Sequence, residues 1–428
     1  MYSAPNYGAR VAVVGAGISG LASAYLLARR YKVTLFEAAS YPGGHTNTVD
    51  VTLEGMTHPV DTGFLVFNNH TYPNLISLFD ELGVDTHSSD MSFSVSLDNG
   101  RLEWAGSDLN TVFAQRSNIF SPRFIGMLRD IMRFNGSAQH NLGMAETTGC
   151  SLGELLAQGG YGNTFQRNYL LPMASAIWSS TAADILKFPA ATFLRFCANH
   201  GLLQVRNRPQ WRTVVGGGRE YVKRMIREIR DLRLNTPVLQ ISRSASSISI
   251  LTSSGVEQFD AVVMATHAPD TLRMLANPDE CERAVLGAVR YQKNVAMLHT
   301  DISLLPRRRR VWSAWNYLGA NTTGGSRPVC VSYLVNQLQP LPFGTPLVVT
   351  LNPISLPAQE TLLSSFEYEH PILDLSVIAA QTQLSSLQGV YNTWHAGAWT
   401  GYGFHEDGLN SALRVARGFG VSPEWATL

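Results

Sequence analysis

The sequence predicts an α/β fold, in which a parallel sheet with helices is assembled from separated stretches of the chain and joined to an α+β domain. Three observations predict it. The chain opens with a strand, a glycine turn, a helix and a second strand. Strand-like apolar runs return after residue 205 and again after residue 390. A mainly helical stretch separates the first two of these regions.

The opening unit is short and regular. Residues 11–14 form an apolar, β-branched run that is typical of a buried strand. Apolar residues then recur at helical spacing from Ile18, and a second strand at residues 33–36 ends at Glu37. This order of elements is that of a Rossmann-like βαβ unit.

The glycines of this unit have the spacing GxGxxG. Gly15 permits the sharp turn out of the strand, Gly17 lets the backbone approach a pyrophosphate, and Gly20 lets the helix pack closely on the sheet. The helix N-terminus offers unpaired N–H groups to the phosphates. We therefore expect the whole turn to bind a dinucleotide: Gly15, Ala16, Gly17, Ile18, Ser19 and Gly20.

An acidic residue stands where a dinucleotide site needs one. Glu37 follows Gly17 by 20 residues and can accept hydrogen bonds from a ribose diol, with Ala38 beside it. A plain glycine-rich turn is the alternative, and the strand–turn–helix–strand context favours the dinucleotide.

Composition and charge exclude several classes of protein. The 428 residues are 45% apolar and 15% charged, and their net charge of +1 gives no indication of nucleic-acid binding. The four cysteines lie far apart without a CxxC pair, which argues against a dithiol reductase and against a metal site built on cysteine. The polar N-terminus and the lack of an apolar run of ~20 residues predict a cytoplasmic protein.

One basic run stands out. Residues 307–310 are four consecutive arginines after Pro306. A solvated loop is the simpler interpretation, and contact with anionic lipid headgroups, which would make the protein peripherally membrane-associated, is the alternative.

The chain divides into five predicted segments. Residues 1–69, 205–275 and 385–428 build the dinucleotide-binding domain, residues 70–204 form a mainly helical insertion, and residues 276–384 form a β-rich part of the substrate domain. The apolar residues of the insertion could form a core or could line a tunnel for an apolar substrate.

The later segments continue both patterns. Helices are predicted at residues 72–82, 124–134, 152–156, 170–178, 193–197 and 220–230, and strands at residues 91–97, 235–241, 259–266, 295–299, 311–315, 328–335 and 347–351. Gly216–Gly218 is not a second GxGxxG, because Tyr221 holds the third glycine position, so no separate nicotinamide site is expected. A strand, a glycine loop and a helix close the chain after residue 390.

In order and motif, the chain resembles the flavin-containing amine oxidase superfamily, which includes phytoene desaturase and protoporphyrinogen oxidase. The stretches GGHTNTVDV (43–51), VDTGFLVFN (60–68), LLPMASAIWS (170–179) and GYGFHEDGL (401–409) look most like the FAD-dependent oxidoreductases that accompany cyclopropane fatty acid synthases. The resemblance implies an amine-oxidase-like fold, bound FAD and a lipid methyltransferase as partner. It implies non-covalent FAD, because no cysteine follows Cys330.

The resemblance also implies where FAD lies. Relatives usually carry Arg where this chain has His45, for which a backbone role is simpler than a covalent link to the flavin. The final helix of relatives points its N-terminus at the flavin pyrimidine. The positions carried over are Gly43, Gly44, His45, Thr46, Thr62, Gly63, Phe64, Val238, Ala265, Thr266, Gly397, His405, Glu406 and Asp407.

Three functions remain open at this point. An FAD enzyme could oxidise or desaturate an acyl chain or lipid, with His405 or His200 as the candidate catalytic base and an anchoring role as the alternative for each. An amine oxidase would use an aromatic cage, for which Trp394, Trp399, Tyr402 and Phe404 are available. A non-redox flavoprotein could instead support a lipid methyltransferase.

Overall fold

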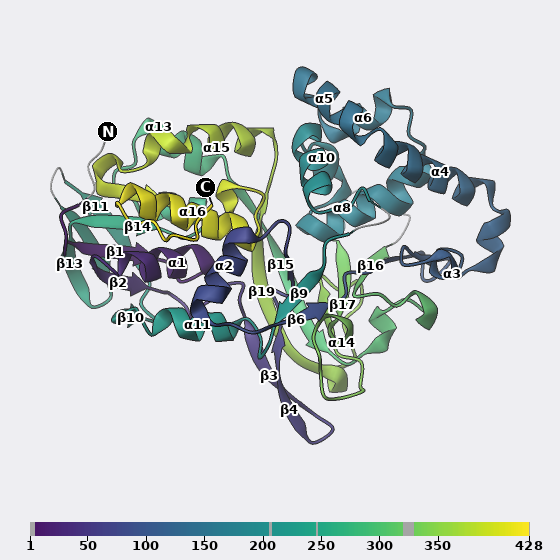
Figure 1. The fold of residues 1–428 in the computed structure, drawn as a ribbon, viewed down its shortest axis with the longest axis horizontal. Helices are drawn as coiled ribbons and strands as arrows, with labels where there is room; N and C mark the ends of the chain where they lie inside the picture. Colours follow the sequence, from purple (N-terminus) through teal and green to yellow (C-terminus); the bar gives the residue numbers. More distant parts are fainter. Residues whose placement is uncertain (1–4, 205–207, 245–246, 320–328, 428) are drawn as a thin grey trace.

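The computed structural model describes residues 5–204, 208–244, 247–319 and 329–427. The described chain forms two lobes (Figure 1), one around a parallel sheet and one that holds a larger sheet and most of the helices of residues 109–199. No helix in these ranges combines the length and the apolar character that crossing a membrane requires.

The first lobe is built on a parallel sheet whose strands come from three parts of the chain. The strand order is β10-β2-β1-β14-β20, and all four neighbouring pairs run parallel. The strands are β1 (Arg10–Val14), β2 (Lys32–Phe36), β10 (Asp231–Arg233), β14 (Ala261–Met264) and β20 (Thr393–His395). This assembly confirms the discontinuous α/β fold, whose central strands are buried on both faces as a doubly covered sheet requires.

The glycines of the first turn let helix α1 (Ile18–Leu27) approach the sheet closely. A Cβ atom on Gly20 would lie 1.7 Å from the carbonyl oxygen of Gly15, and one on Gly15 would lie 2.8 Å from the carbonyl oxygen of Ala265. α1 packs against α16 (His405–Gly418), so the first and last helices of the chain lie side by side (Figure 1).

Helix α2 (Pro73–Leu82) packs in this lobe although the predicted helical insertion begins before it. It contacts α16 and α11 (Arg219–Ile226), and its apolar face joins the core around α1. The Glu406 carboxylate on α16 accepts the backbone N–H groups of Asn74 and Leu75, both at 2.9 Å, which satisfies the free N-terminus of α2.

The second lobe is organised by a seven-stranded sheet of order β19-β15-β18-β17-β16-β7-β8. Its strands are β7 (Phe93–Leu97), β8 (Leu102–Ala105), β15 (Arg290–His299), β16 (Trp315–Gly319), β17 (Cys330–Leu334), β18 (Val348–Leu351) and β19 (Leu362–Ile372). The predicted strand at residues 311–315 is wrong, because a 3-10 turn, η4 (Arg309–Val311), stands there and β16 starts at Trp315. The predicted strand at 235–241 is wrong too, since residues 235–239 lie between β10 and β11.

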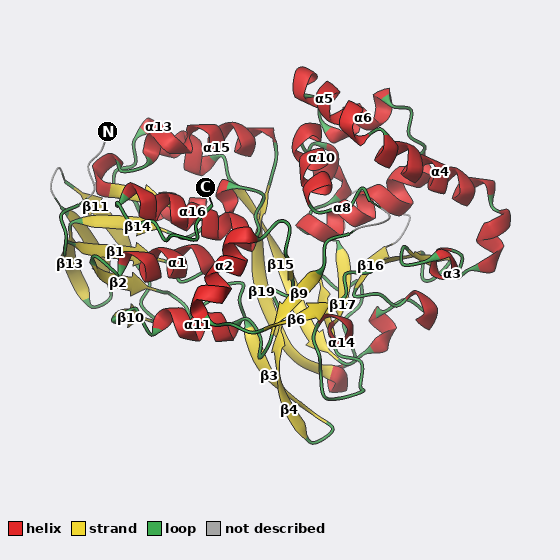
Figure 2. Cartoon of the chain, in the orientation of Figure 1, coloured by secondary structure: helices red, strands yellow, loops and turns green. Residues whose placement is uncertain are grey.

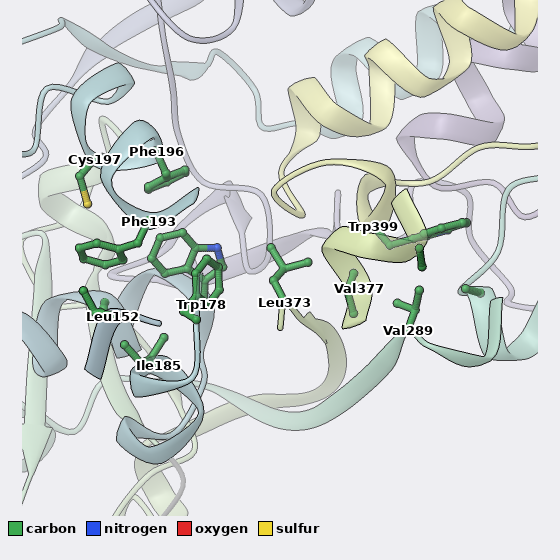
Figure 3. Packing of buried hydrophobic residues seen from close by; sticks show 14 of the residues in the cluster. Leu152, Trp178, Ile185, Phe193, Phe196, Cys197, Val289, Leu373, Val377 and Trp399 are labelled. Atoms are coloured by element: carbon green, nitrogen blue, oxygen red, sulfur yellow. The ribbon is translucent and has the colours of Figure 1, made fainter. Parts of the chain in front are cut away.

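Most of the remaining helices lie along one side of this sheet (Figure 2). They are α3 (Leu109–Val112), η1 (Arg116–Phe120), α4 (Pro122–Gly136), α5 (Ala138–Thr148), α6 (Leu152–Gln158), α7 (Asn163–Phe165), η2 (Gln166–Leu170), α8 (Leu171–Trp178), α9 (Ala182–Leu186) and α10 (Ala190–Asn199). The Trp178 ring packs between these helices, with centroids 4.6 Å from Phe196 and 5.9 Å from Phe193 (Figure 3). α8 and α10 are thereby fixed to each other.

The other elements complete the two lobes. The strands are β3 (Thr48–Leu53), β4 (Met56–Asp61), β5 (Phe67–Asn68), β6 (Thr86–Ser89), β9 (Trp211–Val214), β11 (Gln240–Arg243), β12 (Ile248–Thr252) and β13 (Gly255–Phe259). The helices and short turns are α12 (Ala268–Met274), α13 (Glu280–Gly287), η3 (Ile302–Leu304), α14 (Val335–Leu338), η5 (Gln359–Thr361), α15 (Leu375–Leu387), η6 (Val390–Asn392) and η7 (Ala398–Thr400).

A buried ion pair joins β11 to α13, and its removal should destabilise the protein. The Arg243 and Glu282 side chains are 5% and 2% exposed, and the guanidinium binds both carboxylate oxygens. We expect Arg243→Met to lower the free energy of unfolding by about 3–5 kcal/mol, because it leaves an unpaired buried carboxylate. Urea denaturation measures this loss. The double variant R243M/E282L should recover most of it, and equal losses in both variants would contradict the explanation.

Candidate functional site

A cavity of about 820 Å³ is lined by residues of both lobes. One wall comes from the parallel sheet, where the turn after β1, the end of β2 and the end of β14 meet. The opposite wall comes from α8, α10 and strands β16 to β18. The carboxyl ends of parallel strands thus open into the cavity, which is where such sheets bind ligands.

The turn after β1 forms a cradle of backbone in this cavity. Gly15 adopts φ +97°, and Gly17 follows in extended backbone directly before α1. A Cβ atom on Gly17 would meet no heavy atom within 4 Å, so the backbone here is open to a ligand. The N-terminus of α1 has no side-chain cap, which leaves its first N–H groups free for an anion.

A second glycine turn closes the cradle. The Gly43 N–H donates to the Ala16 carbonyl at 2.8 Å, and Gly44 at φ +58° approaches Gly17 so closely that a Cβ atom would lie 3.2 Å from its Cα. Both glycines line the cavity together with Ala16 and Gly17. The two turns therefore bound one space from two sides.

Glu37 lies at the end of β2 and orders this cradle. Its Oε2 accepts the Ala16 N–H at 2.7 Å, and its Oε1 accepts the Ala39 N–H at 2.8 Å. The carboxylate still lines the cavity and each oxygen keeps a second acceptor site, so a ribose hydroxyl can bind beside these two bonds.

The further predicted cofactor positions divide into two groups. Most line the cavity: Ile18, Ser19, Ala38, His45, Thr62, Gly63, Phe64, Val238, Ala265, Thr266, Gly397 and His405. The others lie behind its wall: Gly20, Thr46, Glu406 and Asp407.

Glu406 and Asp407 serve α16 and its neighbours. Burial raises the pKa of Glu406 to about 7, and its carboxylate caps α2 as described above. Asp407 accepts the Phe404 N–H at 2.9 Å and so caps the start of α16, while burial raises its pKa to about 6. Of the predicted residues at the start of α16, His405 is the one on the cavity wall.

His405 is held by a hydrogen-bonded and aromatic cluster. The hydroxyls of Thr46 and Tyr221 lie 2.9 and 3.1 Å from its Nε2, and the Phe64 ring stacks on the imidazole at 3.7 Å. Burial lowers the pKa of His405 to about 3, so the imidazole is neutral near pH 7, and its Nε2 lies within hydrogen-bond distance of both hydroxyls.

This protonation state predicts a pH dependence of stability. The pKa of His405 is lower in the folded chain than its unfolded value of about 6.5, so the stability it contributes is present above pH 6.5 and is lost as the pH falls toward 3. In the cofactor-free protein, we expect acidification below pH 6.5 to destabilise wild type relative to His405→Gln by up to about 1.4 kcal/mol per pH unit. Denaturant unfolding between pH 7 and pH 4.5 measures the gap, and parallel curves would exclude a buried neutral His405.

His200 faces the same cavity from the end of α10. Its Nδ1–H donates to the Phe196 carbonyl at 3.0 Å, and its ring stacks on the Phe196 ring at 3.9 Å. The proton must therefore be on Nδ1, which leaves Nε2 as an acceptor without a hydrogen-bond partner among the residues described. Burial lowers the pKa of His200 to about 4.

His45 stands where relatives of this type usually have arginine, and its main bond is made by its backbone. Its carbonyl accepts the Phe64 N–H at 2.8 Å, and a Cβ atom on Gly63 would lie 2.2 Å from that carbonyl oxygen. Burial and the neighbouring His370 hold the pKa of His45 well below its usual range. A neutral imidazole cannot supply the charge of an arginine, so phosphate binding falls to the backbone N–H groups.

Several residues of the cavity wall were not predicted from the sequence. Strand β19 brings Tyr368, Glu369 and His370 to the wall, and His267 follows Thr266 directly. The Asn294 amide donates to Nδ1 of His370 at 3.0 Å, which orients that imidazole toward His45, 5.0 Å away between centroids. Phe366, Tyr368 and His370 are aromatic rings at every second position, a pattern that could have indicated one face of a strand here.

The described residues of the cavity wall include neither a metal-binding group of side chains nor a cysteine. Within the described ranges, no group of three His, Cys, Asp or Glu side chains is placed to hold a metal ion. The four cysteines are free thiols, and the cavity wall contains none of them.

Comparison with known proteins agrees with this geometry. The model of the flavin containing amine oxidoreductase family matches residues 18–298. The chain belongs to this family. It is an FAD-dependent oxidoreductase, and the uncapped helix N-terminus and the open Gly17 backbone fit the pyrophosphate of non-covalently bound FAD.

Solved structures share the fold at low sequence identity. A CLA-producing fatty acid isomerase from P. acnes is 15% identical with a TM-score of 0.68, and the match covers 96% of this chain and 98% of that one. Wild-type putrescine oxidase bound to putrescine is 17% identical with a TM-score of 0.68, covering 96% and 99%. Cyclohexylamine oxidase from Brevibacterium oxydans is 16% identical with a TM-score of 0.66, covering 96% and 99%. A sequence search of curated proteins finds no match.

Proposed function

We propose that this oxidoreductase oxidises or desaturates an apolar acyl chain, free or within a lipid. The observation that carries the proposal is the distribution of charge around the cavity. The charged side chains on its described wall are Glu37, which follows β2, Asp270 and Arg273 on α12, and Glu369 on β19. The last three have side chains between 35% and 73% exposed, so they stand at the rim.

The part of the cavity away from the glycine cradle is apolar and aromatic. It lies between α8, α10 and the ends of β16 to β18, and we call it the apolar arm. The apolar arm is lined by Met91, Ile177, Trp178, Phe196, Leu202, Trp211, Trp315, Tyr333, Val349 and Leu351. An acyl chain can bury its methylene groups here at ~25 cal/mol per Å² of apolar surface removed from water.

A charged substrate group would find no counter-ion among the described residues of the apolar arm. Burying an ammonium or a carboxylate there without a partner is costly, so a charged headgroup would have to stay at the rim. That rim carries charges of both signs, because Arg273 pairs with Asp270 and His267 lies 3.2 Å from the Glu369 carboxylate, so a polar headgroup can stay in contact with water there. These placements favour an acyl substrate whose polar end remains outside.

The amine oxidase alternative receives less support from the aromatic residues. Trp399, Tyr402 and Phe404 line the cavity. Trp394 instead packs on Phe419 at 4.3 Å inside the first lobe and is 4% exposed. The expected four-residue cage is therefore incomplete, and the described part of the apolar arm has no carboxylate for an ammonium.

The reaction needs a hydride acceptor and a proton acceptor. Bound FAD supplies the two-electron acceptor. Among this chain's own residues, the Nε2 atom of His200 is our candidate to receive a proton, because no described residue forms a hydrogen bond with it and it lies beside Phe404 and Trp211 on the wall. His405 has its Nε2 engaged by hydroxyls, which suits a positioning role at the start of α16.

The remaining partner expectation follows from the resemblance. This oxidoreductase and a lipid methyltransferase would then both modify the acyl chain of the same lipid. We keep this association as a proposal alongside the substrate. A non-redox role in support of such a methyltransferase is the alternative, and any reduction of the flavin by a substrate would exclude it.

Anaerobic reduction tests the proposal. The FAD-loaded protein is mixed without oxygen with oleate, methyl oleate and dioleoyl phosphatidylcholine in one series, and with putrescine and benzylamine in another. We expect loss of the visible flavin absorbance with at least one acyl compound and none with the amines. Reduction by an amine alone, with peroxide release in air, would overturn the acyl assignment.

A further inference from the structure

Helices α3 and α4 form the end of the second lobe farthest from the parallel sheet (Figure 1). The stretch of chain that contains them carries a group of exposed large apolar side chains. They are Leu109 on α3, Ile119 and Phe120 on η1, and Ile125 and Met132 on α4, and we call them the apolar tip. Phe120 is 86% exposed and Leu109 is 77% exposed. Of 18 large apolar residues exposed in the described chain, these five fall within 24 residues, so exposed apolar side chains are concentrated in this stretch of the chain.

The same stretch is basic. Residues 109–136 contain Arg116, Arg123, Arg129 and Arg133 against a single acid, Asp130, which is buried and pairs with Arg133 at 3.2 Å. Arg129 and Met132 follow Ile125 by four and seven positions and so share the solvent-facing side of α4. The core-facing side carries Phe124, Met127 and Phe134.

The run of four arginines lies beside the apolar tip. η4 and α3 both contact strand β8. The fully buried Glu103 on β8 binds the Arg308 guanidinium at 2.7 Å and the Arg307 N–H at 2.7 Å, which anchors the run. Arg307, Arg309 and Arg310 are exposed and make no ion pair within the described chain.

We propose that the apolar tip and the neighbouring arginines dock on the surface of an anionic lipid bilayer. Phe, Leu, Ile and Met side chains enter the boundary between headgroups and acyl chains, while arginines bind the lipid phosphates. The charge is complementary to such a surface. A second copy of this chain is a poorer partner, because a two-fold interface between copies would place arginines opposite arginines.

The position also fits the geometry of the protein. The apolar tip is formed by the short helix α3, the 3-10 turn η1 and the solvent-facing side of α4 at the periphery, so insertion needs no rearrangement of the core. The docking surface is separate from the cavity wall, so the inference holds whatever substrate the cavity takes.

Vesicle flotation with the FAD-loaded full chain tests the proposal. The probes are phosphatidylcholine vesicles with and without phosphatidylglycerol. We expect wild type to float with the anionic vesicles and to be partly released by salt. L109S/F120S should reduce the partition coefficient at least tenfold, and R307S/R309S/R310S should abolish the preference for anionic vesicles.

A matched control separates docking from general stickiness. Val256 and Leu356 are 60% and 75% exposed and lie outside the apolar tip, so V256S/L356S should float like wild type. Flavin content and the melting temperature should be equal in all variants. Wild type that floats with neither vesicle, or L109S/F120S that floats like wild type, would overturn the proposal. Conversion of a dimer to a monomer by L109S/F120S without a change in flotation would also overturn it and assign the tip to a second copy.

Discussion

Valine in place of Gly17 is expected to leave the protein folded and to weaken FAD binding at least a hundredfold. Gly17 has φ −70° and ψ −178°, which any residue adopts, and a Cβ atom there meets no protein atom within 4 Å. The added side chain would instead occupy the space in which a pyrophosphate approaches the N-terminus of α1. A hundredfold loss corresponds to about 2.8 kcal/mol of binding free energy.

Titration of the cofactor-free protein with FAD, followed by flavin fluorescence, measures this effect, and thermal unfolding shows whether the fold is retained. Gly20→Ala is the matched comparison, because its Cβ atom would lie 1.7 Å from the Gly15 carbonyl oxygen. We expect that variant to lose the fold itself. Wild-type FAD affinity in Gly17→Val would show that the cofactor phosphates do not lie in the cradle.

Aspartate in place of Ile177 is expected to reduce the affinity for an acyl chain about a hundredfold while leaving FAD affinity unchanged. Ile177 is partly exposed to the cavity from α8, in a region where the described wall has no charged side chain. A carboxylate there would be stripped of water by a bound hydrocarbon chain without gaining a partner. The same group would give an ammonium a counter-ion.

The change in the flavin absorbance spectrum on titration with methyl oleate measures acyl binding. The same titration with benzylamine measures amine binding. Ile177→Leu keeps the volume and apolar character and should bind methyl oleate like wild type. Equal methyl oleate affinity in Ile177→Asp would contradict the assignment of the apolar arm to the acyl chain.

Local patterns are the reason that the cofactor half of the site was readable from sequence. The strand, glycine turn, helix and strand of residues 10–37 are close in the chain, and each residue type has its own physical reason to stand there. The same holds for Gly43 and Gly44, which meet the first turn after one helix and one strand. The discontinuous sheet followed from three such runs with parallel-sheet character.

Long-range pairing is the reason that the substrate half was harder to read. β19 alternates aromatic and polar residues with few aliphatic ones, and it becomes a strand by pairing along its length with β15. The pairing of β7 with β16 joins residues more than 200 positions apart, which no local pattern reveals. His370 reaches the cavity wall through the first of these pairings.

Protonation states also depend on tertiary packing. The sequence placed His405 at the start of the last helix, where a histidine could titrate near neutrality. The stacked Phe64 and the hydroxyls of Thr46 and Tyr221 come from distant segments, and the burial they create lowers its pKa to about 3. A proton-accepting role for it could therefore not be judged before the fold was known.

The position of a heavy atom on a bound acyl chain tests most directly that one cavity holds FAD and an apolar substrate together. The FAD-loaded protein is crystallised with a stearoyl ester that carries bromine on its last carbon, and anomalous diffraction locates the bromine. We predict that it lies in the apolar arm, between α8 and α10 on one side and β16 to β18 on the other. A bromine on the outer surface, with FAD bound and the apolar arm free of acyl density, would contradict this claim.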